Sequence, residues 1–117
     1  MIIKKQDVVT DVVTGLAGGT GEVKRTHFIT QDQFNGAGRL FAKQVLAPGH
    51  TIGEHLHENE QEVYVILEGK ARYYDNGTEV ELEAGDVTLC PSGETHAIEN
   101  IGDTDLVFLG LITNVIE

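Results

Sequence analysis

An all-β fold is the class that the sequence predicts, and two observations carry this prediction. From Glu22 onward, short runs rich in β-branched and aromatic residues alternate with turn residues, as in "EVKRTHFI" and "EVYVILEG". No segment after residue 40 has the periodicity of a long amphipathic helix. Many short, evenly spaced antiparallel strands are typical of a sandwich or jelly roll, so we expect one all-β domain.

The expected strands follow one another along the chain with turn signals between them. They lie within residues 22–29, 39–49, 54–57, 62–69, 84–93, 95–100 and 105–116, and residues 70–82 form a hairpin. Asp75, Asn76 and Gly77 suit the tight turn of that hairpin, because these residue types tolerate positive φ angles. Pro48 and Gly49 end the strand that precedes them.

The first 35 residues are less regular than the rest of the chain. Four valines, at positions 8, 9, 12 and 13, lie close to helical spacing, but β-branched residues favour strands. We therefore expect one or two strands in an N-terminal segment, residues 1–35, and a barrel over residues 36–117.

The segment "LVFLGLI", residues 106–112, is apolar on both faces of its expected strand. A strand with one hydrated face would alternate apolar and polar residues, so we expect the outer face of this strand to be covered. Either a second subunit or the chain's own N-terminal segment satisfies this expectation. We favour a homodimer, with residues 1–35 as a candidate part of its interface.

The charge balance excludes some classes of partner. The chain has 8 Lys+Arg against 19 Asp+Glu, a formal net charge of −11. Such an acidic surface repels phosphate backbones and anionic membranes, so we expect neither nucleic acid nor membrane as a partner. The single cysteine, Cys90, fits a reducing compartment, and we see no signal peptide and no apolar run of membrane-spanning length. We therefore expect a cytoplasmic protein.

Two histidines on one strand, His55 and His57, indicate a metal site. Residues i and i+2 project from the same face of a strand, so the two imidazoles lie together. Glu62 opens the next strand and faces the same cavity if that strand pairs with the histidine strand, and His96 lies on a later strand. A lone histidine is more often a surface or hydrogen-bonded core residue than a metal ligand. Together, three imidazoles suit Zn, Cu, Fe or Ni, and the carboxylate extends the range to Mn.

At these residues the chain resembles the cupin family. The first cupin motif, G-x5-H-x-H-x(3,4)-E-x6-G, matches Gly49, His55, His57, Glu62 and Gly69. The second motif, G-x5-P-x-G-x2-H-x3-N, matches Gly85, Pro91, Gly93, His96 and Asn100. All ten fixed positions match, and the resemblance covers residues 39–112.

The resemblance implies a double-stranded β-helix, the cupin jelly-roll barrel, as a single domain that often dimerises. It also implies a divalent transition metal, Mn, Fe, Ni or Zn, as cofactor. The ligands implied by the motifs are His55, His57, Glu62 and His96. Gln61 is the alternative to Glu62 if the register slips, and we prefer Glu62 because a carboxylate is the better ligand.

Other side chains near this site are weak candidates for contacting a ligand or for catalysis. Tyr64 shares a strand face with Glu62, so its hydroxyl either touches a bound ligand or packs as a core aromatic. Arg39 or Lys43 either pairs with a substrate carboxylate or stays a surface charge. His27 is a candidate for the rim of the site.

Four protein ligands satisfy a structural zinc, whereas an ion of higher coordination number keeps positions for a chelating ligand. The resemblance brings in several chemistries: oxalate decarboxylation, dioxygenation, sugar-phosphate isomerisation and simple binding. We expect a metal-dependent enzyme acting on a small oxygenated or carboxylate compound. The alternatives are a non-catalytic binding or sensor protein and a structural metal site in an interaction protein. No acidic residue is identifiable as the proton donor that oxalate decarboxylation needs.

Overall fold

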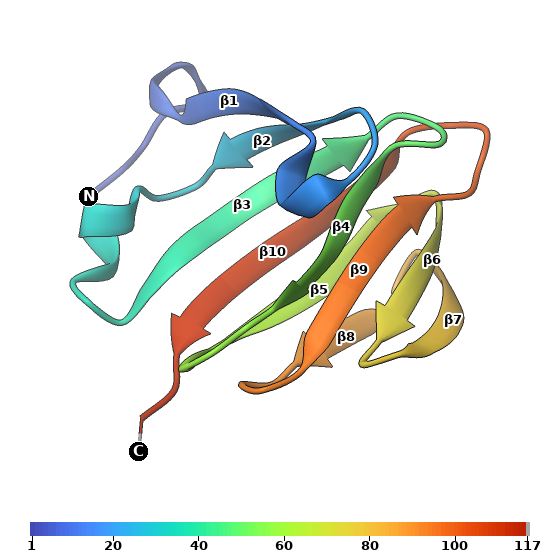
Figure 1. Ribbon diagram of the computed structural model, residues 1–117. Helices are drawn as coiled ribbons and strands as arrows, with labels where there is room; N and C mark the ends of the chain where they lie inside the picture. Colours follow the sequence, from blue (N-terminus) through green and yellow to red (C-terminus); the bar gives the residue numbers. More distant parts are fainter. Residues whose placement is uncertain (117) are drawn as a thin grey trace.

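Ten strands make up most of the computed structural model, which describes residues 1–116 (Figure 1). They are β1 (Val9–Thr14), β2 (Glu22–His27), β3 (Gly38–Leu46), β4 (Thr51–Leu56), β5 (Glu60–Glu68), β6 (Lys70–Asp75), β7 (Thr78–Glu83), β8 (Val87–Cys90), β9 (Thr95–Asn100) and β10 (Leu106–Asn114). Three short 3-10 helices are η1 (Lys5–Asp7), η2 (Leu16–Gly18) and η3 (Gln31–Phe34). Within residues 1–116, no helix is long and apolar enough to cross a bilayer.

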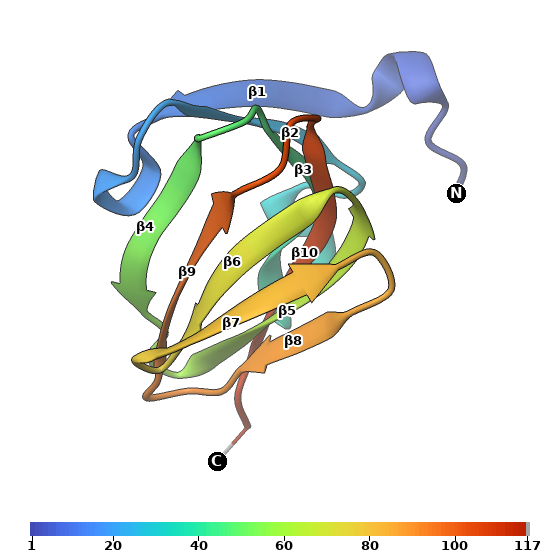
Figure 2. The same ribbon diagram turned by 90° about the vertical axis from the view of Figure 1, so that its right-hand side faces the viewer.

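The strands form two antiparallel sheets that face each other. One sheet has six strands in the order β1-β2-β3-β10-β5-β8, and the other has four in the order β4-β9-β6-β7. Figure 2 looks onto the smaller sheet, with β10 and β5 behind it. This arrangement confirms the predicted all-β, jelly-roll barrel.

The core lies between the sheets because apolar residues alternate along the strands that line it. On β10, Leu106, Phe108 and Ile112 point inward and are buried, whereas Val107 and Leu109 are only partly buried. Tyr64 and Ile66 on β5 face them from the neighbouring strand. A period of two puts every second side chain on the same face of a strand, so one sequence pattern builds both the core and the outer face.

The predicted hairpin is confirmed. β6 pairs with β7 through a two-residue connection, Asn76-Gly77. Both residues have positive φ angles, 48° for Asn76 and 94° for Gly77. Such a turn matches the right-handed twist of the flanking strands.

The Glu62 strand does not pair with the histidine strand, the condition under which the sequence places Glu62 in the same cavity. β4, which carries His55, pairs with β9, whereas β5, which carries Glu62, pairs with β10 and β8 in the other sheet. The turn between β4 and β5 therefore crosses from one sheet to the other. Glu62 still faces the histidines because the inner faces of the two sheets look at each other.

The N-terminal strands extend the larger sheet and do not lie across its outer face. β1 pairs with β2, and β2 pairs with β3, so both continue the sheet beyond β3 (Figure 1). Coverage of β10 by the chain's own N-terminal segment, one of the two expected alternatives, is therefore wrong. The division of the chain at residue 35 remains a prediction.

Candidate metal centre

Four side chains from three strands and one turn converge at one end of the barrel. His55 on β4 lies directly opposite His96 on β9, and His57 follows immediately after β4. Glu62 reaches the same place from β5 in the facing sheet. One donor atom from each of the four lies within 4.8 Å of all the others. The structure thus brings together all four residues that the motifs indicate.

The distances between these atoms fit a single metal ion. The Nε2 atom of His96 lies 3.0 Å from that of His55 and 3.0 Å from that of His57. Glu62 Oε1 lies 3.1 Å from the Nε2 atoms of both His57 and His96, and 3.9 Å from that of His55. Two donor atoms that each bind one ion at about 2.1 Å and at right angles are about 3 Å apart.

The other ring nitrogen of each histidine has a partner that orients the ring. His55 Nδ1 donates to the carbonyl oxygen of Gly53 at 2.7 Å, and a carbonyl can only accept. His57 Nδ1 lies 2.9 Å from Glu60 Oε1, and His96 Nδ1 lies 2.8 Å from the Tyr73 hydroxyl. A proton on Nδ1 leaves the lone pair on Nε2, the atom that faces the common point.

Burial and charge act in opposite directions on the acidic member of the cluster. Burial alone would raise the pKa of Glu62, but the three histidines beside it outweigh burial and hold that pKa well below the usual range. The hydrogen bond to Glu62 raises the pKa of His57, whereas burial lowers the pKa of His96. The carboxylate therefore stays ionised among imidazoles, as a metal ligand must.

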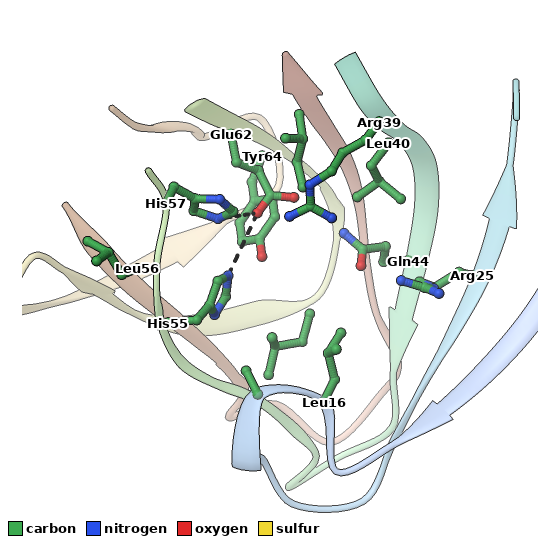
Figure 3. A pocket seen from close by; sticks show the side chains of 13 residues that line it. Leu16, Arg25, Arg39, Leu40, Gln44, His55, Leu56, His57, Glu62 and Tyr64 are labelled. Carbon is green, nitrogen blue, oxygen red and sulfur yellow. Dashed lines mark hydrogen bonds and ion pairs between the residues drawn. The ribbon is translucent and has the colours of Figure 1, made fainter. Parts of the chain in front are cut away.

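A cavity of about 310 Å³ opens beside the cluster (Figure 3). Its lining residues are Leu16, Ala17, Arg25, Arg39, Leu40, Gln44, Ile52, His55, Leu56, His57, Glu62, Tyr64 and Ile112. Three of the four cluster residues line it, and His55 is the most exposed of the four. A small molecule in this cavity would therefore reach an ion held by the cluster.

Two guanidinium groups line the same cavity, and a carboxylate holds each of them. Arg39 donates to both oxygens of Glu60, at 2.7 and 2.8 Å. Arg25 donates to both oxygens of Asp11, at 2.8 Å each. Bidentate pairs fix a guanidinium in one orientation, so both positive groups are pre-positioned. In Figure 3, Arg39 points toward Glu62 across the mouth of the cavity.

The remaining sequence candidates divide between this cavity and other places. Tyr64 lines the cavity but is buried, and its ring stacks on His96 with centroids 4.9 Å apart. Lys43 is exposed and is not among the lining residues. His27 pairs with Asp11 at 3.2 Å and lines a separate cavity under the N-terminus. The roles of Tyr64, Arg39 and His27 toward a ligand remain predictions.

Three residues at the site were not found from the sequence. Glu60 and Tyr73 orient metal-cluster histidines, but nothing in their spacing distinguishes them from other acids and aromatics. Gln44 carries a usable signal, because it interrupts the apolar series of inward positions on β3 formed with Leu40 and Leu46. A buried amide among apolar neighbours is costly unless it has a partner.

A double-stranded β-barrel with three histidines and a carboxylate converging at one end defines a class of metal-binding proteins. The family model described as "Cupin domain" matches residues 42–112. The chain therefore belongs to the cupin family, and the resemblance of its two motifs is confirmed.

Individual relatives agree with this assignment. An "Oxalate-binding protein" from Thermotoga maritima is 41% identical over 112 residues, which are 96% of this chain and 93% of the relative. A crystal structure of "a predicted oxalate decarboxylase" from the same organism superimposes with a TM-score of 0.91 at 40% identity, covering 98% of this chain and 100% of that one. A germin-like protein from Morus alba is 31% identical over 80% of this chain and 50% of its own length.

Proposed function

We propose that this cupin holds a divalent metal ion and binds a small carboxylate compound at that ion. The proposed ligands are His55, His57, Glu62 and His96, and Mn, Fe, Ni and Zn are the candidate ions. The observation that carries the proposal is the convergence of these four donor atoms, with bare Nε2 lone pairs, at the wall of an open cavity. When bound, the ion supplies Lewis acidity and positions for ligand oxygens.

The charges around the cavity support an anionic ligand. The chain as a whole carries a formal net charge of −11, so an anion is attracted only where cations are local. Arg25 and Arg39 supply two such cations, each already oriented by a carboxylate. A small carboxylate also fits the name of the oxalate-binding relative, which is 41% identical to this chain over 112 residues.

Turnover of the ligand is the second candidate function, as a metal-dependent decarboxylase, dioxygenase or isomerase. The open cavity beside the cluster favours it, since a second reactant has room to enter. Decarboxylation also needs a proton donor, and Glu62 is the only carboxyl group among the residues that line the cavity. As a proposed metal ligand, Glu62 must stay ionised and is not available as that donor. Binding without turnover is therefore the primary proposal for this site.

Calorimetric titration with oxalate tests the proposal. We expect the protein loaded with Mn²⁺ or Zn²⁺ to bind oxalate and the protein treated with a chelator to bind it far more weakly. Equal binding by the two forms would contradict the proposal. Incubation of the loaded protein with oxalate and other small acids, followed by CO2 release and O2 consumption, separates the two candidates, because sustained turnover would make the chain an enzyme.

The outer face of the larger sheet supports the homodimer. Its outward positions on β5, β8 and β10 carry no charged residue, and they are Gln61, Val63, Val65, Leu67, Val87, Leu89, Val107, Leu109, Leu111 and Thr113. Two copies placed face to face would bring no like charges together, despite 19 acidic residues in each chain. Light scattering should show that the wild type is a dimer and that Leu109→Lys is a monomer.

The lone cysteine supports our proposal of a cytoplasmic location.

A further inference from the structure

Gln44 is a polar side chain in a position that the fold reserves for apolar ones. It lies on β3 and points inward, where Leu40, Ala42 and Leu46 occupy the neighbouring inward positions. Its side chain is buried, with only 2% of the residue exposed. A leucine would pack there without the cost of desolvating an amide, so packing alone does not account for the residue.

The amide of Gln44 reaches along β10 toward the metal cluster. Gln44 itself pairs with Phe108, but its Nε2 atom lies 2.5 Å from the place where a Cβ on Gly110 would be. Glu62 Oε2 lies 3.2 Å from the same place. Because Gly110 has no side chain, it leaves space for the amide of Gln44. Figure 3 shows the amide facing the cavity between Arg39 and Arg25.

The Nε2 group of Gln44 has no hydrogen-bond partner. In residues 1–116, buried side-chain atoms without a partner belong to Gln44, Arg72 and Thr88, and of these only Gln44 lines the cavity. Buried polar groups are almost always paired, so each exception calls for an explanation. Here the unpaired donor sits where the cavity, the cluster and two guanidinium groups meet.

We propose that Gln44 is a specificity-determining residue whose Nε2 group donates a hydrogen bond to a carboxylate oxygen of the ligand. This inference rests on the proposed function, since it concerns the same ligand at the same site. The ligand class is a small dicarboxylate or 2-oxo acid, because such a compound keeps a further oxygen acceptor beyond those that it offers to the metal.

The choice of an amide has a chemical reason. A carboxylate at position 44 would compete for the metal and would repel an anionic ligand beside Glu62. A lysine or arginine would form an ion pair with Glu62 and weaken it as a ligand. An amide donates without carrying charge, and it stays a donor at every pH at which the histidines bind metal.

Three variants of the metal-loaded protein test the inference by calorimetry with oxalate as the probe. Gln44→Leu removes the donor and keeps most of the volume, and we expect oxalate affinity to fall roughly ten- to hundredfold, the effect of one hydrogen bond to a charged group. Gln44→Glu replaces the donor by an anion and should bind more weakly still. The matched control is Gln31→Leu, which makes the same substitution at an exposed glutamine of η3, and its oxalate affinity should equal that of the wild type.

Metal affinity, measured separately by titration of the metal-free proteins, is the second readout. We expect Gln44→Leu to bind the metal as the wild type does. Equal oxalate affinity of Gln44→Leu and wild type overturns the inference and leaves the proposed function intact. A parallel loss of metal affinity also overturns it, because Gln44 would then serve to hold Glu62. If the wild type binds no oxalate at all, the proposed function fails and this inference fails with it.

Discussion

The two walls of the cavity differ in how their polar side chains are paired. The metal wall consists of β4, the turn after it and β5, with His96 of β9 beside them, and the donor atoms of the cluster lie about 3 Å apart. The facing wall consists of β2, β3 and η2, and each of its two cations is paired with a carboxylate, Arg25 with Asp11 and Arg39 with Glu60. The metal wall thus contains the four donors of the proposed metal site, whereas the facing wall contains the Nε2 group of Gln44, which has no hydrogen-bond partner.

The two walls also differ in their relation to the family. All four residues of the metal wall lie within the matched residues 42–112. Leu16, Ala17, Arg25 and Arg39, which belong to the facing wall, precede that range. The facing wall is therefore built partly from residues outside the matched range, although Gln44 lies within it. The following experiments separate the two walls.

Replacing one of the four proposed metal ligands should cause the largest loss of metal affinity. We expect His96→Ala to weaken metal binding by more than about 100-fold, beyond the effect typical of removing a residue that only orients a ligand. A competition titration against a chromogenic chelator measures this affinity. His50→Gln is the control, since His50 lies outside the cluster and contacts the backbone of Glu22. Unchanged metal affinity in a folded His96→Ala protein would refute the assignment of the cluster.

Glu60 contacts residues of both walls, so replacing it should cause the second-largest loss of metal affinity. It accepts from His57 Nδ1 and holds Arg39 with both oxygens. We expect Glu60→Gln to lower metal affinity about 10- to 100-fold, the usual range for a residue that orients a metal ligand. The matched control is Glu58→Gln, which removes the same charge from an exposed position in the same turn. Equal metal affinities in the two variants would show that Glu60 does not support the metal wall.

The two walls were unequally predictable from the sequence. His55, His57, Glu62 and His96 could be found because strand periodicity and fixed motif spacing place such residues together. The facing wall depends on long-range pairing: Arg25 reaches the cavity only because β2 joins the sheet beside β3. Strand order is set by the whole core, and no local pattern encodes it. The same reason explains why the sequence could not decide whether β5 pairs with β4.

Gly19 tests how firmly the facing wall is fixed. It follows η2, and a Cβ on it would collide with the backbone of Thr51 and Gly53 on β4. We expect Gly19→Ala to push η2 away from β4 and to lower the free energy of unfolding by about 1–3 kcal/mol, the usual cost of overpacking. Urea denaturation measures this change. Gly102→Ala is the control, because its Cβ would make only ordinary contacts, the nearest at 3.5 Å. Equal stability of the two variants would mean that η2 can move away from β4 without a loss of folding free energy.

Removing the charge of Asp11, the carboxylate paired with Arg25, should have the smallest effect of these changes. The effect is on the free energy of unfolding, and it should depend on pH. The hydrogen bond from Arg25 lowers the pKa of Asp11 below its ordinary value of 3.8, although partial burial opposes this shift. A group whose pKa is lower in the folded state stabilises the fold above its unfolded pKa, and the contribution disappears as the pH falls through the folded pKa. We therefore expect Asp11→Asn to be less stable than the wild type at neutral pH, by less than about 1 kcal/mol because the pair is partly exposed.

The difference between Asp11→Asn and the wild type should shrink once the pH falls below 3.8. Thermal or urea unfolding of both proteins at a series of pH values measures it, and Asp7→Asn, an exposed carboxylate of the same segment, should show no such difference. A gap that stays constant down to about pH 2 would mean that Asp11 acts by packing and not by its charge. In that case contacts other than the ion pair with Asp11 would hold Arg25 in the cavity. The ion pairs of the facing wall would then contribute little to its stability, despite their bidentate geometry.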